Sequence, residues 1–144
     1  MFFYFPAIAT VALALSFFGR WAAETYLHKR ILLIDQTVGL DPVQNPGVAF
    51  GLQLPEPYQN LIVLGAIVFV CILAIVSRKT KVSQAGYGLI VGGGLANIID
   101  RMGDGFVTDF FQVGTFPVFN LADSCITIGA VLLLAEIFIM KRSS

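Results

Sequence analysis

Four long apolar segments separated by polar stretches dominate the hydrophobic pattern of the chain. They span residues 2–18, 58–76, 82–99 and 119–140, and each is close to the ~20 residues that a helix needs to cross a bilayer. The third segment is diluted by glycines, which favour close packing between membrane helices. The pattern therefore predicts a mainly α membrane protein, a single domain over residues 1–144 with four transmembrane helices.

The polar stretches predict short outer elements. RWAAETYLHKR at 20–30 continues the first apolar segment as a polar helical extension, and ILLID at 31–35 is typical of a short strand. DPVQNPG at 41–47 is dense in turn residues. VAFGLQL at 48–54 is either a strand or a short interfacial helix, because periodicity cannot decide over so few residues. We expect a glycine-containing loop over residues 102–118.

The basic residues predict the orientation in the membrane. One group lies between the second and third segments and another follows the fourth; these are Arg78, Lys79, Lys81, Lys141 and Arg142. With four spans both groups share one side, which the positive-inside rule makes the cytoplasm. Both termini are then cytoplasmic, and eight of the nine acidic residues, between positions 24 and 123, belong to the outer side.

The composition limits the kinds of partner and cofactor that the chain is expected to bind. The chain is 57% hydrophobic and 12% charged, with a formal net charge of zero, so no nucleic-acid partner is implied. Cys71 and Cys125 lie inside apolar segments and are expected to pack as small hydrophobes. His28 is the one histidine. No metal site and no cofactor are therefore expected, and a bundle of this size is expected to act as a monomer.

Two aspartates at the edges of apolar segments are the candidate catalytic residues. They are Asp109 in FVTDFF and Asp123 in FNLADS. A carboxylate beside the membrane is costly, and two that share a proton form a general acid/base pair, since like charges at short range cannot both ionise easily. Such a dyad needs neither a metal nor a nucleophilic side chain. The nearby polar residues are Asn97, Asp100, Arg101 and Asn120.

Each of these residues also has a structural interpretation. Asp123 can cap the fourth helix, where an acid is stabilised by the helix N-terminus, and Asp109 can be a loop carboxylate that faces water. Asp100 and Arg101 can form an ion pair at the end of the third helix. Asn97 can bridge helices through hydrogen bonds. From the residues alone, a non-catalytic membrane scaffold or transporter subunit is the alternative to an enzyme.

Three blocks resemble the signatures of one family. NPGVAFGL at 45–52, GGGLANIIDRMGDGFVTDF at 92–110 and FNLADSCITIG at 119–129 are similar to those of the lipoprotein signal peptidases, also called signal peptidase II. The resemblance implies an aspartyl endopeptidase of the bacterial inner membrane. Its substrates would be prolipoproteins, cut just before a diacylglyceryl-modified cysteine, and membrane lipids would surround it.

The resemblance also implies a fold and a set of site residues. The fold would be four transmembrane helices with a small extracytoplasmic β-sheet cradle and a short interfacial helix. Asp109 and Asp123 match the catalytic dyad, near the outer face. The remaining matched residues would hold the dyad and bind the substrate; they are Asn45, Gly47, Asn97, Asp100, Arg101 and Asn120.

The chain departs from the family pattern in the first helix. Members usually carry an Asp with a Lys four residues later, whereas this chain has Ser16 and Arg20. Arg20 keeps the positive charge, and the missing Asp is not part of the dyad. Ala96 stands where the family has a small glycine. These departures leave open a pseudo-enzyme that binds lipoprotein precursors without cleaving them.

Overall fold

Four long helices form the body of the protein, as the hydrophobic pattern predicts. The computed structural model describes residues 4–47, 58–77 and 80–142. Each helix is long and apolar enough to cross a membrane. They are α1 (Tyr4–Tyr26), α2 (Tyr58–Ser77), α3 (Lys81–Asp104) and α4 (Leu121–Arg142). The predicted polar extension of the first segment is therefore helical as far as Tyr26.

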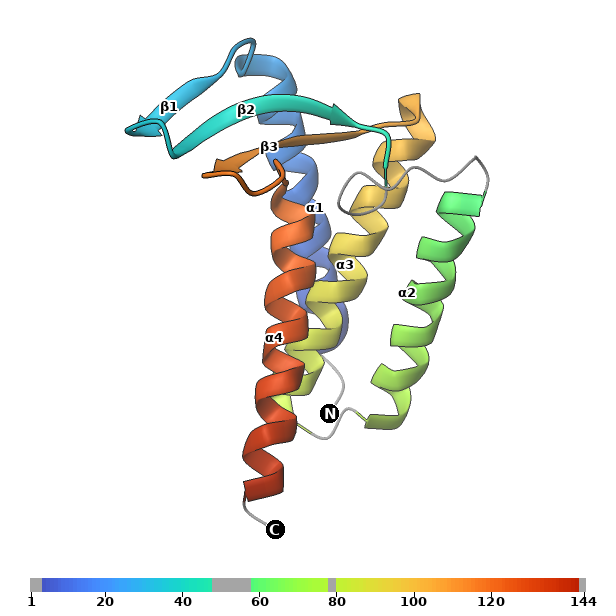
Figure 1. Cartoon of the computed structure of the whole chain (residues 1–144). Helices are drawn as coiled ribbons and strands as arrows, with labels where there is room; N and C mark the ends of the chain where they lie inside the picture. Colours follow the sequence, from blue (N-terminus) through green and yellow to red (C-terminus); the bar gives the residue numbers. More distant parts are fainter. Residues whose placement is uncertain (1–3, 48–57, 78–79, 143–144) are drawn as a thin grey trace.

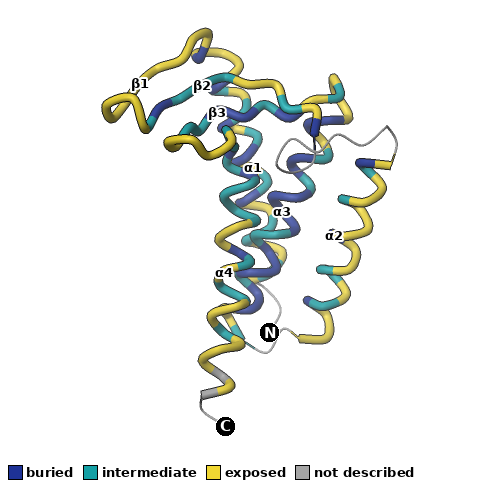
Figure 2. The backbone as a smooth tube through the Cα atoms, in the orientation of Figure 1, coloured by how far each residue is buried: buried dark blue, intermediate teal, exposed yellow. Residues whose placement is uncertain are grey.

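Helix α3 is the centre of the bundle. Of its most apolar stretch 61% is buried, against 11–17% for the other three helices, whose outward faces are apolar and exposed (Figure 2). Glycines allow this packing: a Cβ at Gly92 would clash with the Ala9 carbonyl oxygen of α1, and one at Gly93 would lie 2.5 Å from the Ala122 carbonyl oxygen of α4. The prediction that this glycine run serves close helix packing is confirmed.

A three-stranded antiparallel sheet lies across one end of the bundle, and the C-terminal end of α4 lies at the other (Figure 1). The strands are β1 (Ile31–Ile34), β2 (Val38–Asn45) and β3 (Val107–Val113), in the order β1-β2-β3. Strand β1 confirms the strand predicted at ILLID. The sheet is anchored to α1 by a small core in which Phe110 of β3 packs with Ala23 and Leu27.

Two predictions for the outer stretches are wrong. The stretch 41–47, predicted as a turn, continues β2 as far as Asn45. Pro42 is tolerated there because the pairing of β2 with β3 is irregular between Leu40 and Val43, and a proline fits a strand at a bulge. The stretch 102–118, predicted as a loop, contains β3. VAFGLQL, and with it the expected interfacial helix, lies outside the described residues.

Candidate active site

Strand pairing places Asp109 in the buried part of the sheet. Asp109 pairs with Val43 across β2 and β3, and the residue is only 1% exposed. Asn45 lies two residues further along β2, on the same face as Val43 because side chains alternate along a strand. Its Nδ2 donates a 2.8 Å hydrogen bond to Asp109 Oδ2. The amide orientation is fixed by the backbone N–H of Gly47, which donates to Asn45 Oδ1 at 2.8 Å.

The second aspartate lies in the first turn of α4. The backbone N–H of Asp123 donates to Asn120 Oδ1 at 2.9 Å, and the backbone N–H of Asn120 donates to Asp123 Oδ2 at 3.3 Å. This reciprocal arrangement is a capping box, which satisfies two N–H groups that the helix start would leave unpaired. The capping interpretation of Asp123 is therefore confirmed, and the same carboxylate is also linked to Asp109 through the network described next.

Asn120 and Asn97 connect the two carboxylates. Asn120 Nδ2 donates to Asp109 Oδ1 at 2.9 Å and to Asn97 Oδ1 at 3.1 Å. Asn97 Nδ2, on α3, donates to Asp123 Oδ1 at 2.9 Å. Each of the four carboxylate oxygens thus accepts an N–H group, and three asparagines hold the pair from β2, from α3 and from the start of α4. Asn97 does bridge helices, as its structural interpretation predicted, but it does so onto a carboxylate.

The surroundings of Asp109 favour its protonated form. Burial, which penalises the charged form, raises the pKa of Asp109 to about 7, and the negative charge of Asp123 adds to the rise. The hydrogen bonds from Asn45 and Asn120 and the charge of Arg101 oppose the rise. A carboxyl group that holds its proton near neutral pH beside a second carboxylate is the arrangement required for acid/base chemistry.

Both aspartates face a groove of about 630 Å³. Its apolar walls include Val63 on α2 and Ile126 and Ile128 on α4, and Gly94 of α3 also lines it. The polar side chains that line it are Asn45, Asn97, Arg101, Asp109, Asp123, Ser124 and Thr127. A groove of this size with an apolar lining and a few polar groups is typical of a ligand site.

Arg101 closes the site on the α3 side. It is 5% exposed, and its guanidinium donates to the backbone carbonyl of Gly47 and, at 3.4 Å, to that of Asn97. The guanidinium is therefore buried with its positive charge near Asp109. It binds the backbone of Gly47, whose N–H orients the Asn45 amide that donates to Asp109. The predicted site residues Asn45, Gly47 and Arg101 therefore belong to one continuous network.

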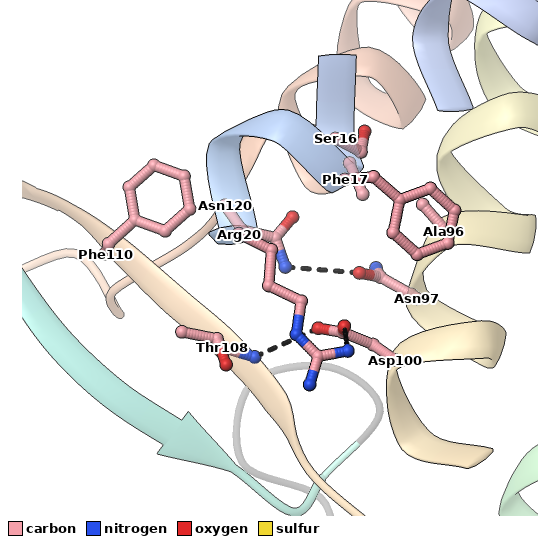
Figure 3. A pocket seen from close by; sticks show the side chains of 10 residues that line it. Ser16, Phe17, Arg20, Ala96, Asn97, Asp100, Thr108, Phe110 and Asn120 are labelled. Atoms are coloured by element: carbon pink, nitrogen blue, oxygen red, sulfur yellow. Dashed lines mark hydrogen bonds and ion pairs between the residues drawn. The ribbon is translucent and has the colours of Figure 1, made fainter. Parts of the chain in front are cut away.

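Asp100 lies in a different cluster, next to Arg20 and Thr108 (Figure 3). It forms an ion pair with Arg20 of α1, a partner other than the Arg101 that the sequence suggested. Asp100 Oδ2 also accepts the backbone N–H of Thr108 at 3.2 Å. Thr108 is the neighbour of Asp109 in β3, and Asp100 is not among the residues that line the groove. This cluster therefore supports the dyad from outside the groove.

The same cluster accounts for the departure from the family at Ser16. Arg20 Nε lies 2.7 Å from Glu24 Oε1, and its guanidinium is 3.8 Å from Asp104. The charge of Arg20 is therefore met by carboxylates on α1 and α3 without an Asp one turn earlier. Ser16 donates instead to the Ala12 carbonyl of its own helix, at 2.8 Å, and lines a small cavity beside Arg20 and Asp100.

Two residues that sequence reasoning missed contribute to the site. Thr108 links β3 to α1, since its hydroxyl donates to Glu24 Oε1 at 2.9 Å. Gln59, in the first turn of α2, donates to the Pro46 carbonyl at 2.8 Å. The signal for Gln59 was an amide at the start of an otherwise apolar segment, where a buried polar group needs a partner.

Comparison with known proteins identifies relatives across nearly the whole chain. The family model of signal peptidase (SPase) II matches residues 8–139. A lipoprotein signal peptidase of Chlorobium luteolum is 35% identical, over 90% of this chain and 87% of the relative. One of Syntrophomonas wolfei is 41% identical, over 79% of this chain and 78% of the relative. A bacterial membrane enzyme solved in meso at 2.3 Å resolution superposes with a TM-score of 0.81 and 26% identity, over 96% of this chain and 88% of that one.

Proposed function

Since the chain belongs to the signal peptidase II family, it is an aspartic-type membrane peptidase that removes signal peptides from lipoprotein precursors, and we propose that Asp109 and Asp123 perform its chemistry. The observation that carries the proposal is the shared amide network. Two carboxylates from distant elements accept hydrogen bonds from Asn120, and both line the same apolar groove. A purely structural role would not require both to face that groove.

The two aspartates have different roles in this proposal. Asp123 lies at the N-terminus of α4, which stabilises negative charge, and acts as the general base that takes a proton from the attacking water. Asp109, whose pKa is raised to about 7, gives its proton to the scissile carbonyl oxygen. Water then adds to the carbonyl carbon, and the tetrahedral intermediate collapses when Asp123 passes its proton to the leaving nitrogen and Asp109 recovers its own.

The groove is the proposed binding site for the lipid of the substrate. The proposed substrate carries a diacylglyceryl group on the cysteine just after the cleaved bond. The apolar walls on α2 and α4 would hold the acyl chains, while the asparagines hold the dyad. Because the polar residues and the apolar walls belong to one groove, binding the lipid positions the adjacent peptide bond.

The proposed orientation puts the dyad at the outer face of the membrane. Lys81 at the start of α3 and Lys141 near the end of α4 lie at the end of the bundle away from the sheet (Figure 1). The positive-inside rule assigns that end to the cytoplasm. The sheet and the dyad are then extracytoplasmic, where the cleavage point of an exported precursor emerges. The proposed active form is a monomer, because the N–H groups of this chain already supply a hydrogen bond to each oxygen of both carboxylates.

Lipid dependence is the experiment that tests this function. Purified protein in detergent is given a prolipoprotein peptide with and without the diacylglyceryl group, and the products are identified by mass spectrometry. We expect cleavage just before the modified cysteine and little or none of the unmodified peptide. Equal cleavage of both peptides would refute the role of the groove, and cleavage of neither would refute the function.

A further inference from the structure

Gln59 ties α2 to the strand segment that carries Asn45. Gln59 is 1% exposed, as buried as Asp109 itself, although α2 is strongly apolar and largely exposed. Its Nε2 donates to the Pro46 carbonyl at 2.8 Å. The bond joins positions thirteen residues apart in the chain. A fully buried amide at this place needs hydrogen-bond partners, and one of them is the backbone next to a site residue.

The segment 45–47 is held from three directions. Gln59 binds the Pro46 carbonyl from α2, and Arg101 binds the Gly47 carbonyl from α3. The Gly47 N–H donates to Asn45 Oδ1, which leaves Asn45 Nδ2 directed at Asp109 Oδ2. The orientation of the Asn45 amide therefore depends on the backbone position of Gly47. Gln59 helps to hold that position through its hydrogen bond to the carbonyl of the preceding residue, Pro46.

We propose that Gln59 is a positioning residue of the peptidase, which acts through Pro46 and Asn45 to keep an amide donor on Asp109. The inference rests on the proposed role of Asp109 in cleavage. Gln59 touches no reacting atom; it links α2, one wall of the groove, to the hydrogen bonding of the dyad. A displacement of α2 therefore weakens the hydrogen bond that Asn45 donates to Asp109.

Loss of Gln59 has a consequence that a purely structural role would not have. The Asn45 hydrogen bond favours the ionised form of Asp109. When the 45–47 segment loosens, that bond weakens and the pKa of Asp109 rises further. The basic limb of the kcat/KM profile then moves to higher pH, and kcat falls roughly fivefold to tenfold, the effect of one hydrogen bond. The KM changes less, because Gln59 is not among the residues that line the groove.

The test measures the titration of Asp109 directly, by ¹³C NMR of the carboxyl carbon in detergent micelles, with the signal assigned by its loss in Asp109→Asn. The variants are Gln59→Met and Gln59→Leu, which remove the donor without adding a charge, and Asn45→Ala, with Leu61→Ala as the control. Leu61 lies two residues after Gln59 and is 57% exposed. We expect both Gln59 variants to shift the midpoint upward, toward that of Asn45→Ala, and the control to leave it unchanged.

A double-mutant cycle decides whether the two residues act together. If Gln59 acts through Asn45, Gln59→Met combined with Asn45→Ala titrates like Asn45→Ala alone. Additive shifts, or an unchanged midpoint in both folded Gln59 variants, would overturn the inference. Cleavage assays on the same samples separate the two proposals. Cleavage without the midpoint shift refutes the role of Gln59 alone, whereas the shift in a protein that cleaves no substrate refutes the proposed function alone.

Discussion

Replacing Asp109 by Asn should stabilise the protein at neutral pH while it abolishes cleavage. An acid whose pKa is higher in the folded protein than in the unfolded chain binds its proton more tightly when folded. It therefore has no effect on stability well below the unfolded pKa, and it destabilises the fold progressively as the pH rises through the window between the two values. For Asp109 that window runs from 3.8 to about 7.

The magnitude follows from the width of the window. A pKa rise from 3.8 to about 7 corresponds to about 4 kcal/mol lost by pH 7, at about 1.4 kcal/mol for each pH unit. The Asp109→Asn substitution removes this cost. The N–H₂ of the new amide, however, faces one of the two donors, Asn45 or Asn120, which bind the carboxylate in the wild type. One such mismatch costs about 1–3 kcal/mol. The net gain at pH 7.5 is about 2 kcal/mol, the difference between the two effects.

Thermal unfolding of the purified variants at pH 5 and pH 7.5 is the assay. A gain of about 2 kcal/mol corresponds to a Tm increase of about 4–8 °C at pH 7.5, and the difference should close at pH 5. Asp35→Asn is the matched control, because Asp35 is exposed in the turn after β1 at φ 46°, a conformation that Asn accepts. If Asp109→Asn were less stable than the wild type at both pH values, Asp109 would be a carboxylate that stabilises the fold, and the reasoning would be refuted.

Three further predictions concern the packing, the pH dependence and the first helix. Gly93→Val should destabilise the protein by about 1–3 kcal/mol and reduce cleavage, since its Cβ would lie 2.5 Å from the Ala122 carbonyl; thermal unfolding and cleavage rates check this, and an unchanged Tm would contradict it. The kcat/KM profile should fall above a pH of about 7, when Asp109 loses its proton; a profile that is flat from about pH 5 to 9 would contradict this. Ser16→Ala should change kcat/KM less than about twofold, because Ser16 binds its own helix through a single hydroxyl hydrogen bond. By contrast, Arg20→Met should cost about 3 kcal/mol of stability by leaving buried Asp100 without its ion pair. An unchanged Tm in Arg20→Met, or a loss of kcat/KM in Ser16→Ala well beyond about twofold, would contradict these predictions.

The helices were predictable from the sequence because a bilayer imposes a simple requirement. A span needs about 20 apolar residues, and the predicted segments 58–76 and 82–99 agree closely with Tyr58–Ser77 and Lys81–Asp104. The strands were harder to predict. VTDFFQV of β3 lies between glycines and is only 7 residues long, and Asp41-Pro42 suggests a turn where β2 has an irregularity. Such short strands are determined by their partners, which local sequence does not reveal.

The sequence identified the candidate site residues more reliably than it identified the contacts between them. The spacing of Asp109 and Asp123 permitted them to meet but did not require it; they meet through Asn120, which is also the cap of α4. The sequence pairs Asp100 with its neighbour Arg101, whereas the ion-pair partner in the structure is Arg20, far earlier in the chain on α1. The link from Gln59 to Pro46 joins two elements that flank the groove. These pairings depend on how the helices and the sheet pack.

The most direct test of the central claim is cleavage of a diacylglyceryl-modified prolipoprotein by purified wild type, Asp109→Asn, Asp123→Asn and the Asp35→Asn control, each shown to be folded. We predict cleavage just before the modified cysteine by the wild type and the control, and a loss of at least about a thousandfold in both dyad variants. Wild-type rates in either dyad variant would contradict the assignment of these two aspartates as the catalytic pair.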